Sequence, residues 1–234
     1  MLENKEQFIV ILTGRSYLYQ LLQSLFGNEP NREILEQFTA DITENAVSLF
    51  FEESASETAD FLALIAKVRD ELNVGGEDFV DSLRSEYTRL FIGPASLPSP
   101  PWESVHKSGE KLLLQKETLE VRMVYKRNGF VSKTYPHEPD DHIGIELDFM
   151  YRLSEQTSAS LEADNLEGAR SLISEQQAFL VEHLLAWVGK FAVGLKKYKT
   201  DSFYAITAVF LDAFLNADKD TLTELSQVIG GQLA

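Results

Sequence analysis

The sequence predicts an all-α protein, a helical bundle of about ten helices in two halves joined by a hinge loop. Three observations predict this class. Apolar residues recur three and four positions apart along most of the 234-residue chain, which is the periodicity of one helix face. Convincing alternating strand patterns and hairpin dipeptides between apolar runs are missing. Glycines and two proline-containing loops separate the periodic stretches, as expected where helices end.

The first half of the chain predicts four helices. The stretch 3–27 has apolar residues at helical spacing and ends on Gly27, a natural C-terminal stop. Three further helices are expected, each with apolar residues on one face, over 31–42, 60–72 and 76–91.

The second half begins beyond two loops. A proline-rich loop follows residue 91, and a helix is then expected over 109–129. The next loop, 130–139, contains two prolines and is the predicted hinge. We therefore divide the chain into an N-terminal helical part, 1–135, which carries the proline-rich loop, and a C-terminal helical part, 136–234. The remaining expected helices are 140–156, 165–195, 202–216 and 220–230.

Composition excludes several classes of function. The chain has no cysteine, so it has neither disulfides nor a cysteine nucleophile, which fits a reducing compartment. It has no run of eighteen consecutive apolar residues, so no membrane span is expected, and its N-terminus is not expected to be a basic, cleavable leader. These features predict a cytoplasmic protein without stable membrane insertion. The formal net charge of −16 repels nucleic acid and anionic membranes and attracts basic partners.

The proline-rich loop, LFIGPASLPSPPWESVH (90–106), holds four of the seven prolines of the chain. Proline fixes φ and removes a backbone donor, so the loop should be extended and stiff. Leu90, Phe91 and Trp102 give it apolar surface, and the indole keeps one N–H for a specific hydrogen bond. Such a rim suits an extended or helical peptide. The alternative is that the aromatic residues only pin the loop onto the core.

The second segment with functional potential is HEPDDHIGIELDFM (137–150). Asp140 or Asp141 is expected to cap the helix that follows Pro139. A metal site is not expected, because His137 and His142 do not share a helix face and no second carboxylate–histidine motif accompanies them.

Two further interpretations of this segment stay open. Asp141 and His142 would serve acid–base catalysis in a helical hydrolase or transferase, although no nucleophile motif or phosphate-binding loop accompanies them. Alternatively, the carboxylates form a recognition site for a cation, most plausibly an arginine of a partner, because they match the guanidinium fork.

Taken together, the motifs resemble those of a known family. EYTRLFIGPASLPSPPWESV (86–105), then EPDDHIGIELDFM (138–150) and two apolar C-terminal helices are similar to the TorD/DmsD family, and the resemblance covers about residues 80–217. It implies an all-helical cytoplasmic maturation chaperone without enzymatic activity. Its partner would be a molybdenum-cofactor oxidoreductase of the DMSO or TMAO reductase type, which it holds until the cofactor is inserted. A nitrate reductase or formate dehydrogenase is the alternative client.

The resemblance also implies a site for the twin-arginine signal peptide of the client. Leu90, Phe91, Pro101 and Trp102 would form an apolar wall, and Glu138 and Asp141 would meet the arginines. The full set of implied peptide-binding residues is Tyr87, Leu90, Phe91, Pro101, Trp102, Glu138, Asp141 and His142.

No cofactor is expected. Some members of the family bind guanine nucleotides, but this sequence has no GxxxxGK[ST] loop. A monomer and a domain-swapped dimer both fit two helical halves joined by a loop. The chain departs from the family motif at Tyr87, Glu103 and His106, which leaves the client open.

Overall fold

The computed structural model describes residues 5–51, 56–93, 96–108, 113–132 and 137–233. Within these ranges the chain is helical and contains no strand, which confirms the predicted all-α class. Two short π-helical segments continue neighbouring α-helices, so the eleven α-helices form ten continuous rods in the described part. The elements are α1 (Lys5–Gly27), α2 (Arg32–Phe38), α3 (Asp41–Ser48), α4 (Ser56–Val74), α5 (Gly76–Tyr87), η1 (Thr88–Ile92), α6 (Glu103–Lys107), α7 (Lys116–Arg127), α8 (Ile143–Glu162), α9 (Leu166–Phe179), η2 (Leu180–Leu184), α10 (Leu185–Tyr198) and α11 (Phe203–Leu233).

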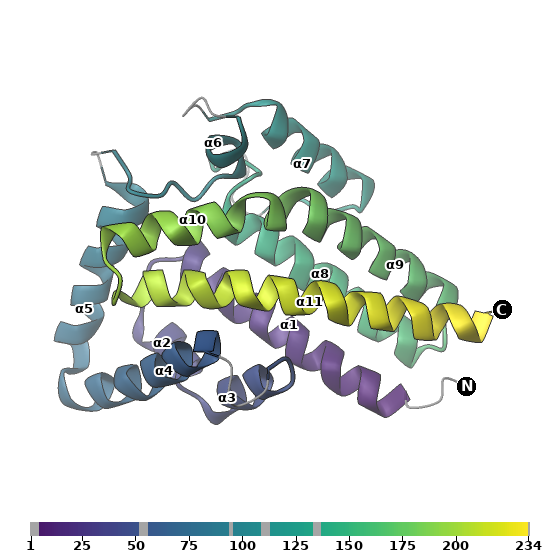
Figure 1. The fold of residues 1–234 in the computed structure, drawn as a ribbon, viewed down its shortest axis with the longest axis horizontal. Coiled ribbons are helices and arrows are strands. Elements are labelled where there is room, and N and C mark those ends of the chain that lie inside the picture. Colours follow the sequence, from purple (N-terminus) through teal and green to yellow (C-terminus); the bar gives the residue numbers. More distant parts are fainter. Residues whose placement is uncertain (1–4, 52–55, 94–95, 109–112, 133–136, 234) are drawn as a thin grey trace.

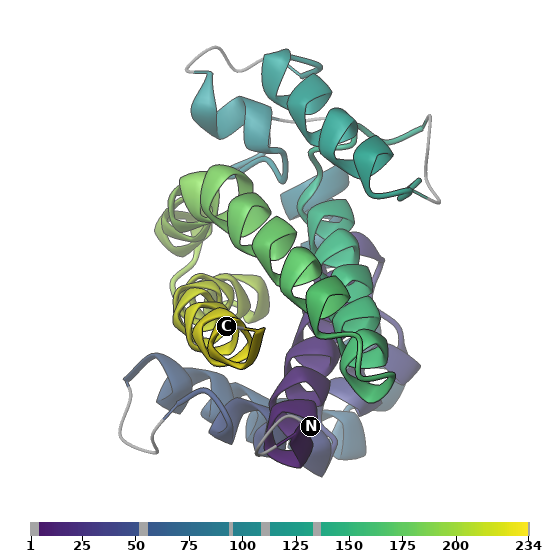
Figure 2. The same ribbon diagram turned by 90° about the vertical axis from the view of Figure 1, so that its right-hand side faces the viewer.

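The centre of the molecule is a bundle of α1, α8, α11 and the long α9–η2–α10 rod (Figure 1). The turned view shows α6 and α7 on one side of this bundle and α3 and α4 on the opposite side (Figure 2). The fully buried side chains include many aromatic rings, whose large apolar areas dominate the core. Phe61 and Phe210 are stacked with centroids 3.8 Å apart, which joins α4 to α11.

Helices α1 and α8 cross at two glycines. A Cβ added to Gly144 would lie 2.6 Å from the Cα of Gly27, so the two backbones approach more closely than any larger residue allows. Gly27 also ends α1, as the sequence predicts, and Pro30 follows shortly after it. The crossing fixes the C-terminal end of α1 beside the first turn of α8.

A buried ion pair links the first helix, α1, to the last helix, α11. The guanidinium of Arg15 on α1 contacts both carboxylate oxygens of Asp218 on α11, and both side chains are fully buried. Tyr19 donates to the same carboxylate at 2.7 Å, and Gln176 accepts from Arg15 at 3.0 Å. Buried charges are tolerated when they are paired and hydrogen-bonded in this way. The network ties α1, α9 and α11 together.

Several expected helix boundaries are wrong. The stretch expected as one helix over 31–42 is divided, because Thr39 ends α2 and a new helix begins at Asp41. Of the helix expected over 109–129, residues 109–112 lie outside the described residues, and the described part becomes helical at Lys116, after Leu114 with its φ of +59°. Conversely, Glu103–Lys107 is helical inside the expected loop. The last two expected helices are one, α11.

The proposed hinge lies partly outside the described residues, which omit 133–136. The division into parts 1–135 and 136–234 therefore stays a prediction. One stretch of the described chain, Leu166–Tyr198, is long and apolar enough to cross a membrane, and half of its most apolar window is buried. This stretch is the α9–η2–α10 rod of the bundle, where packing against α8 and α11 accounts for its apolar character.

Candidate functional site

The two sequence motifs meet in space. Trp102 and His142 form an isolated antiparallel bridge. The Glu103 N–H donates to the Asp141 carbonyl at 3.0 Å, and the Ile143 N–H donates to the Pro101 carbonyl at 2.9 Å. The end of the proline-rich loop is therefore attached by its backbone to the start of α8.

Asp141 lies inside this junction. Its side chain is fully buried, with one oxygen accepting from the Ser104 N–H at 2.9 Å and the other from the Thr118 hydroxyl at 2.8 Å. Asp141 therefore holds the first turn of α6. It does not cap α8, and neither does Asp140, which accepts from Arg122 at 2.6 Å. The expected aspartate cap of α8 is wrong.

His142 takes that capping role. It is the N-cap of α8, and its Nδ1 accepts from the Gly144 N–H at 3.0 Å. Burial lowers the pKa of the imidazole to about 4. The ring is therefore neutral at pH 7, with its proton on Nε2, because Nδ1 is an acceptor.

Trp102 and Glu138 form the outer part of the junction. The Trp102 indole N–H donates to Glu138 Oε1 at 2.7 Å, which is the specific hydrogen bond expected of this indole. The Trp102 and His142 rings meet edge to face, with centroids 5.7 Å apart. Burial raises the pKa of Glu138 and the nearby Asp141 charge adds to this, although the indole hydrogen bond acts in the opposite direction.

The sequence predicts that Leu90 and Phe91 give the proline-rich loop apolar surface, but they lie in the helical segment η1 and belong, like Tyr87, mostly to the core. Leu90 and Phe91 are buried on η1, and Phe91 packs edge to face on Tyr204, with centroids 5.1 Å apart. Tyr87 donates to the Phe26 carbonyl at 3.3 Å. Burial and the charges of Glu138 and Glu29 raise the pKa of Tyr87 to about 12. Its phenol is therefore uncharged at physiological pH.

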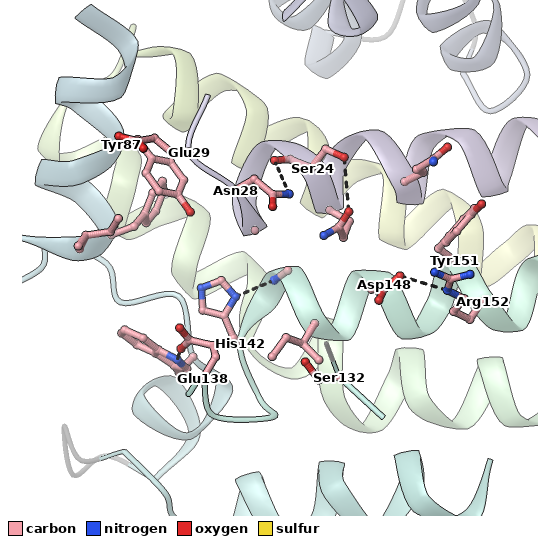
Figure 3. A pocket seen from close by; sticks show the side chains of 18 residues that line it. Ser24, Asn28, Glu29, Tyr87, Ser132, Glu138, His142, Asp148, Tyr151 and Arg152 are labelled. Atoms are coloured by element: carbon pink, nitrogen blue, oxygen red, sulfur yellow. Dashed lines mark hydrogen bonds and ion pairs between the residues drawn. The ribbon is translucent and has the colours of Figure 1, made fainter. Parts of the chain in front are cut away.

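A cavity of about 640 Å³ lies between α1 and α8, beside the junction. Five of the implied residues line it: Tyr87, Phe91, Trp102, Glu138 and His142. Leu90, Pro101 and Asp141 are not among the lining residues; they support the wall from behind. The cavity is elongated, with Glu29, Tyr87 and Glu138 at one end and Asp148, Tyr151 and Arg152 at the other (Figure 3).

The charges of the cavity favour a cation. Among its described lining residues, three carry carboxylates, Glu29, Glu138 and Asp148, and one carries a guanidinium, Arg152. Carboxylates bordered by aromatic rings bind guanidinium groups through both charge and planar stacking. The arrangement therefore suits an arginine side chain from outside the protein.

Trp102 also borders a second, smaller hollow. This groove of about 350 Å³ lies between the proline-rich loop, α6 and α10, and its apolar lining includes Leu97, Pro98, Val105 and Leu113. Trp102 thus stands between an acidic cavity and an apolar groove. Residues 94–95 of the loop lie outside the described residues.

Sequence reasoning missed the contribution of α1 and the later part of α8. Gln20, Gln23 and Asn28 line the cavity from α1 and the residues just after it, and Tyr151 lines it from α8. Their types alone do not distinguish them from an ordinary solvated face. The available signal was the glycine pair, Gly27 and Gly144, which marks where the two helices cross.

Catalysis and metal binding find no support in the described residues. No group of three or more described His, Asp or Glu residues is placed to hold a metal ion. The Asp141 carboxylate is occupied by two hydrogen bonds, and His142 Nδ1 accepts from backbone. The pair therefore has a structural role in this junction.

The comparisons with known proteins identify the class. Residues 44–193 match the family model described as "Nitrate reductase delta subunit". The chain is 29% identical over 206 residues to "Chaperone protein TorD" of Aliivibrio salmonicida, covering 87% of this chain and 92% of that protein. It is 29% identical over 223 residues to the TorD chaperone of Aeromonas salmonicida, covering 93% and 95%. "Probable Tat proofreading chaperone DmsD" of Haemophilus influenzae is 31% identical over 128 residues, covering 55% and 56%.

The chain belongs to this family of redox enzyme maturation chaperones, the TorD/DmsD family. The resemblance read from the sequence motifs is therefore confirmed. The relatives are named as chaperones, so this protein is a chaperone rather than an enzyme. The hydrolase or transferase interpretation of Asp141 and His142 is set aside for the same reason.

Proposed function

We propose that this chaperone binds the twin-arginine signal peptide of a molybdenum-cofactor oxidoreductase in the cavity between α1 and α8. It acts in the cytoplasm and keeps its client from being exported until the client has received its molybdenum cofactor. The observation that carries the proposal is a cavity with three carboxylates among its lining residues, bordered by Trp102 and Tyr87. The name of the Haemophilus relative, a Tat proofreading chaperone, supports the same assignment.

Each part of the peptide has a matching surface. Glu138 is held in place by the Trp102 indole and is partly exposed, so it can accept an arginine. The apolar helix-forming segment would lie beyond Trp102 in the groove lined by Leu97, Pro98 and Val105. Burial of such a segment contributes several kcal/mol at about 25 cal/mol per Å², less the cost of ordering the peptide. Micromolar binding is the expected result.

In this proposal the eight implied residues divide their roles. Trp102, Glu138 and Tyr87 contact the peptide directly. Asp141, His142 and Pro101 hold the junction that positions them. Phe91 forms part of the cavity wall, and Leu90 supports that wall from behind. No cofactor takes part in the proposed binding, and that the protein needs none stays a prediction.

Calorimetric titration with synthetic signal peptides tests the proposal. The peptides carry two adjacent arginines followed by an apolar segment, and the control peptides carry glutamine in place of both arginines. We expect binding of the arginine peptides that weakens at least tenfold in the controls and in Glu138→Gln. Equal binding of both peptides would contradict the acidic cavity as the arginine site.

The client is a separate question. A DMSO or TMAO reductase is the first candidate, but the matched family is described by a nitrate reductase subunit. A nitrate reductase or formate dehydrogenase is therefore the second candidate. Affinity capture of the full-length chaperone from cells that make these enzymes separates the two, by which catalytic subunit is recovered. Size-exclusion chromatography with light scattering on the same sample distinguishes the monomer from the domain-swapped dimer.

A further inference from the structure

The far end of the cavity already holds a guanidinium, and it belongs to the protein itself. The Nε of Arg152 lies 3.5 Å from Asp148 Oδ1, one turn earlier on α8. The same guanidinium lies over the ring of Tyr151, 5.3 Å from its centroid. Figure 3 shows the three side chains together at this end. A carboxylate beside an aromatic face is a favourable environment for a guanidinium.

The hold on Arg152 is weak. Its side chain is 46% exposed and that of Asp148 is 21% exposed, and the contact is longer than a good charge-assisted hydrogen bond. Exposed pairs of this kind contribute little to stability. Asp148 therefore keeps most of its capacity to accept another guanidinium.

A neighbouring hollow could receive the Arg152 side chain if it left Asp148. Asp148 and Arg152 border a third hollow of about 250 Å³, separate from the groove beside Trp102 and lined further by Phe130, Val131 and Gln156. Asp148 and Arg152 thus lie between the main cavity and this smaller hollow. A change of Arg152 rotamer toward the smaller hollow would free the carboxylate without moving α8.

The two ends of the cavity suit two arginines. Glu138 precedes α8, whereas Asp148 lies six residues beyond the N-cap His142, which is about 9 Å along the helix axis. Consecutive side chains of an extended peptide point in opposite directions. Two adjacent arginines of one peptide can therefore reach separate carboxylates at the two ends.

We propose that Asp148 and Tyr151 form a second guanidinium site, which Arg152 occupies in the free protein and from which the second arginine of a bound peptide displaces it. This inference rests on the proposed function of the cavity. Arg152 then acts as a specificity-determining residue. A peptide with one arginine binds at Glu138 alone, and only a peptide with two gains the contacts at Asp148.

The test compares three variants and two peptides by calorimetric titration. The peptides carry Arg-Arg or Arg-Gln before the same apolar segment. The variants are Arg152→Gln, Asp148→Asn and the matched control Arg32→Gln, which removes another exposed arginine with an i,i+4 acidic partner and does not line the cavity. Both arginine variants change the net charge equally, so any long-range charge effect cancels in their comparison.

Arg152→Gln is expected to strengthen Arg-Arg binding about two- to fivefold relative to Arg32→Gln, the range of a weak ion pair, and to leave Arg-Gln binding unchanged. Asp148→Asn is expected to reduce the Arg-Arg affinity to that of Arg-Gln. Equal Arg-Arg affinities for Arg152→Gln and Arg32→Gln, with binding to wild type intact, would overturn this inference and leave the proposed function standing. Absence of binding by wild type and by all variants would overturn both.

Discussion

Glu138 is placed where its protonation controls the charge that the cavity offers. Burial raises its pKa, and the neighbouring Asp141 charge acts in the same direction, while the Trp102 hydrogen bond limits the shift. The carboxylate form binds arginine and the protonated form does not. Binding of an arginine in turn favours the charged form, so the pKa of Glu138 falls when the peptide is bound.

The resulting prediction concerns pH. Because the pKa of Glu138 in the free protein is raised, peptide affinity should begin to fall on acidification at a higher pH than an ordinary glutamate would give. Titrations between pH 4.5 and pH 7.5 measure this, with Glu138→Gln as the control. The variant should bind more weakly with a flatter pH profile. An unchanged profile in Glu138→Gln would assign the pH dependence to another group.

Asp141 carries a different prediction, because its carboxylate is a buried structural acceptor. Asp141→Ala leaves the Ser104 N–H and the Thr118 hydroxyl without their partner. Each unsatisfied buried group costs about 1–3 kcal/mol, so the loss of both partners should lower the free energy of unfolding by about 2–6 kcal/mol. Urea denaturation followed by circular dichroism measures it. Peptide binding should weaken as well, through loss of the junction.

The control for Asp141 is Asp148→Asn, which changes a half-buried carboxylate that lines the cavity. Its free energy of unfolding should stay within about 0.5 kcal/mol of wild type, as for most surface substitutions. If Asp141→Ala proved as stable as Asp148→Asn and yet lost peptide binding, Asp141 would be a direct contact, as the sequence motif alone suggested.

At the scale of elements, the crossing of α1 and α8 sets the floor of the cavity, and Gly27 and Gly144 both line it. Gly144→Ala would place a Cβ 2.6 Å from the Gly27 Cα, so the backbones must separate. Overpacking of this kind costs about 1–3 kcal/mol. We expect that loss in urea denaturation, together with weaker peptide binding because the cavity wall shifts.

Gly230→Ala is the matched control, since it lies within α11 and nothing stands within 4 Å of its added Cβ. Alanine is the better helix former by about 0.5–1 kcal/mol, so this variant should be neutral or slightly more stable. A Gly144→Ala variant that behaved like Gly230→Ala would show that the two helices can separate at no cost.

The sequence predicted most helices because their period and stop signals are local. Gly27 as the end of α1 is one such case. The prediction from the sequence failed where a helix boundary depends on hydrogen bonds to residues far along the chain. Helix α6 begins within the proline-rich loop because Asp141 accepts from Ser104, 37 residues earlier, and the two motifs pair through backbone hydrogen bonds. No local pattern encodes these contacts.

The same limit applies to the candidate site. Five of the eight implied residues line the cavity, and the motif resemblance located them. Gln23 and Asn28 were missed because α1 joins α8 only in the folded chain. In the sequence, Asp148 and Arg152 have the spacing of an ordinary i,i+4 ion pair on a helix face. Only their position beside the cavity in the folded chain makes them candidate binding residues.

At the scale of the whole molecule, the chain has a net charge of −16, and carboxylates also predominate among the charged residues that line the cavity. A field of this sign attracts a basic peptide before contact is made, which raises the association rate more than it slows dissociation. Salt screens this attraction, since the Debye length shortens from about 10 Å at 0.1 M to about 3 Å at 1 M.

The last prediction separates steering from contact. Stopped-flow measurements with an Arg-Arg peptide at 0.05 M and 0.5 M salt should show an association rate at least fivefold slower at high salt, while the dissociation rate changes much less. A peptide with glutamine in place of both arginines should lose most of this salt dependence. If the two peptides slowed equally, the acidic surface would act on the peptide backbone or termini. The arginines would then contribute only through short-range contact with carboxylates of the cavity such as Glu138 and Asp148.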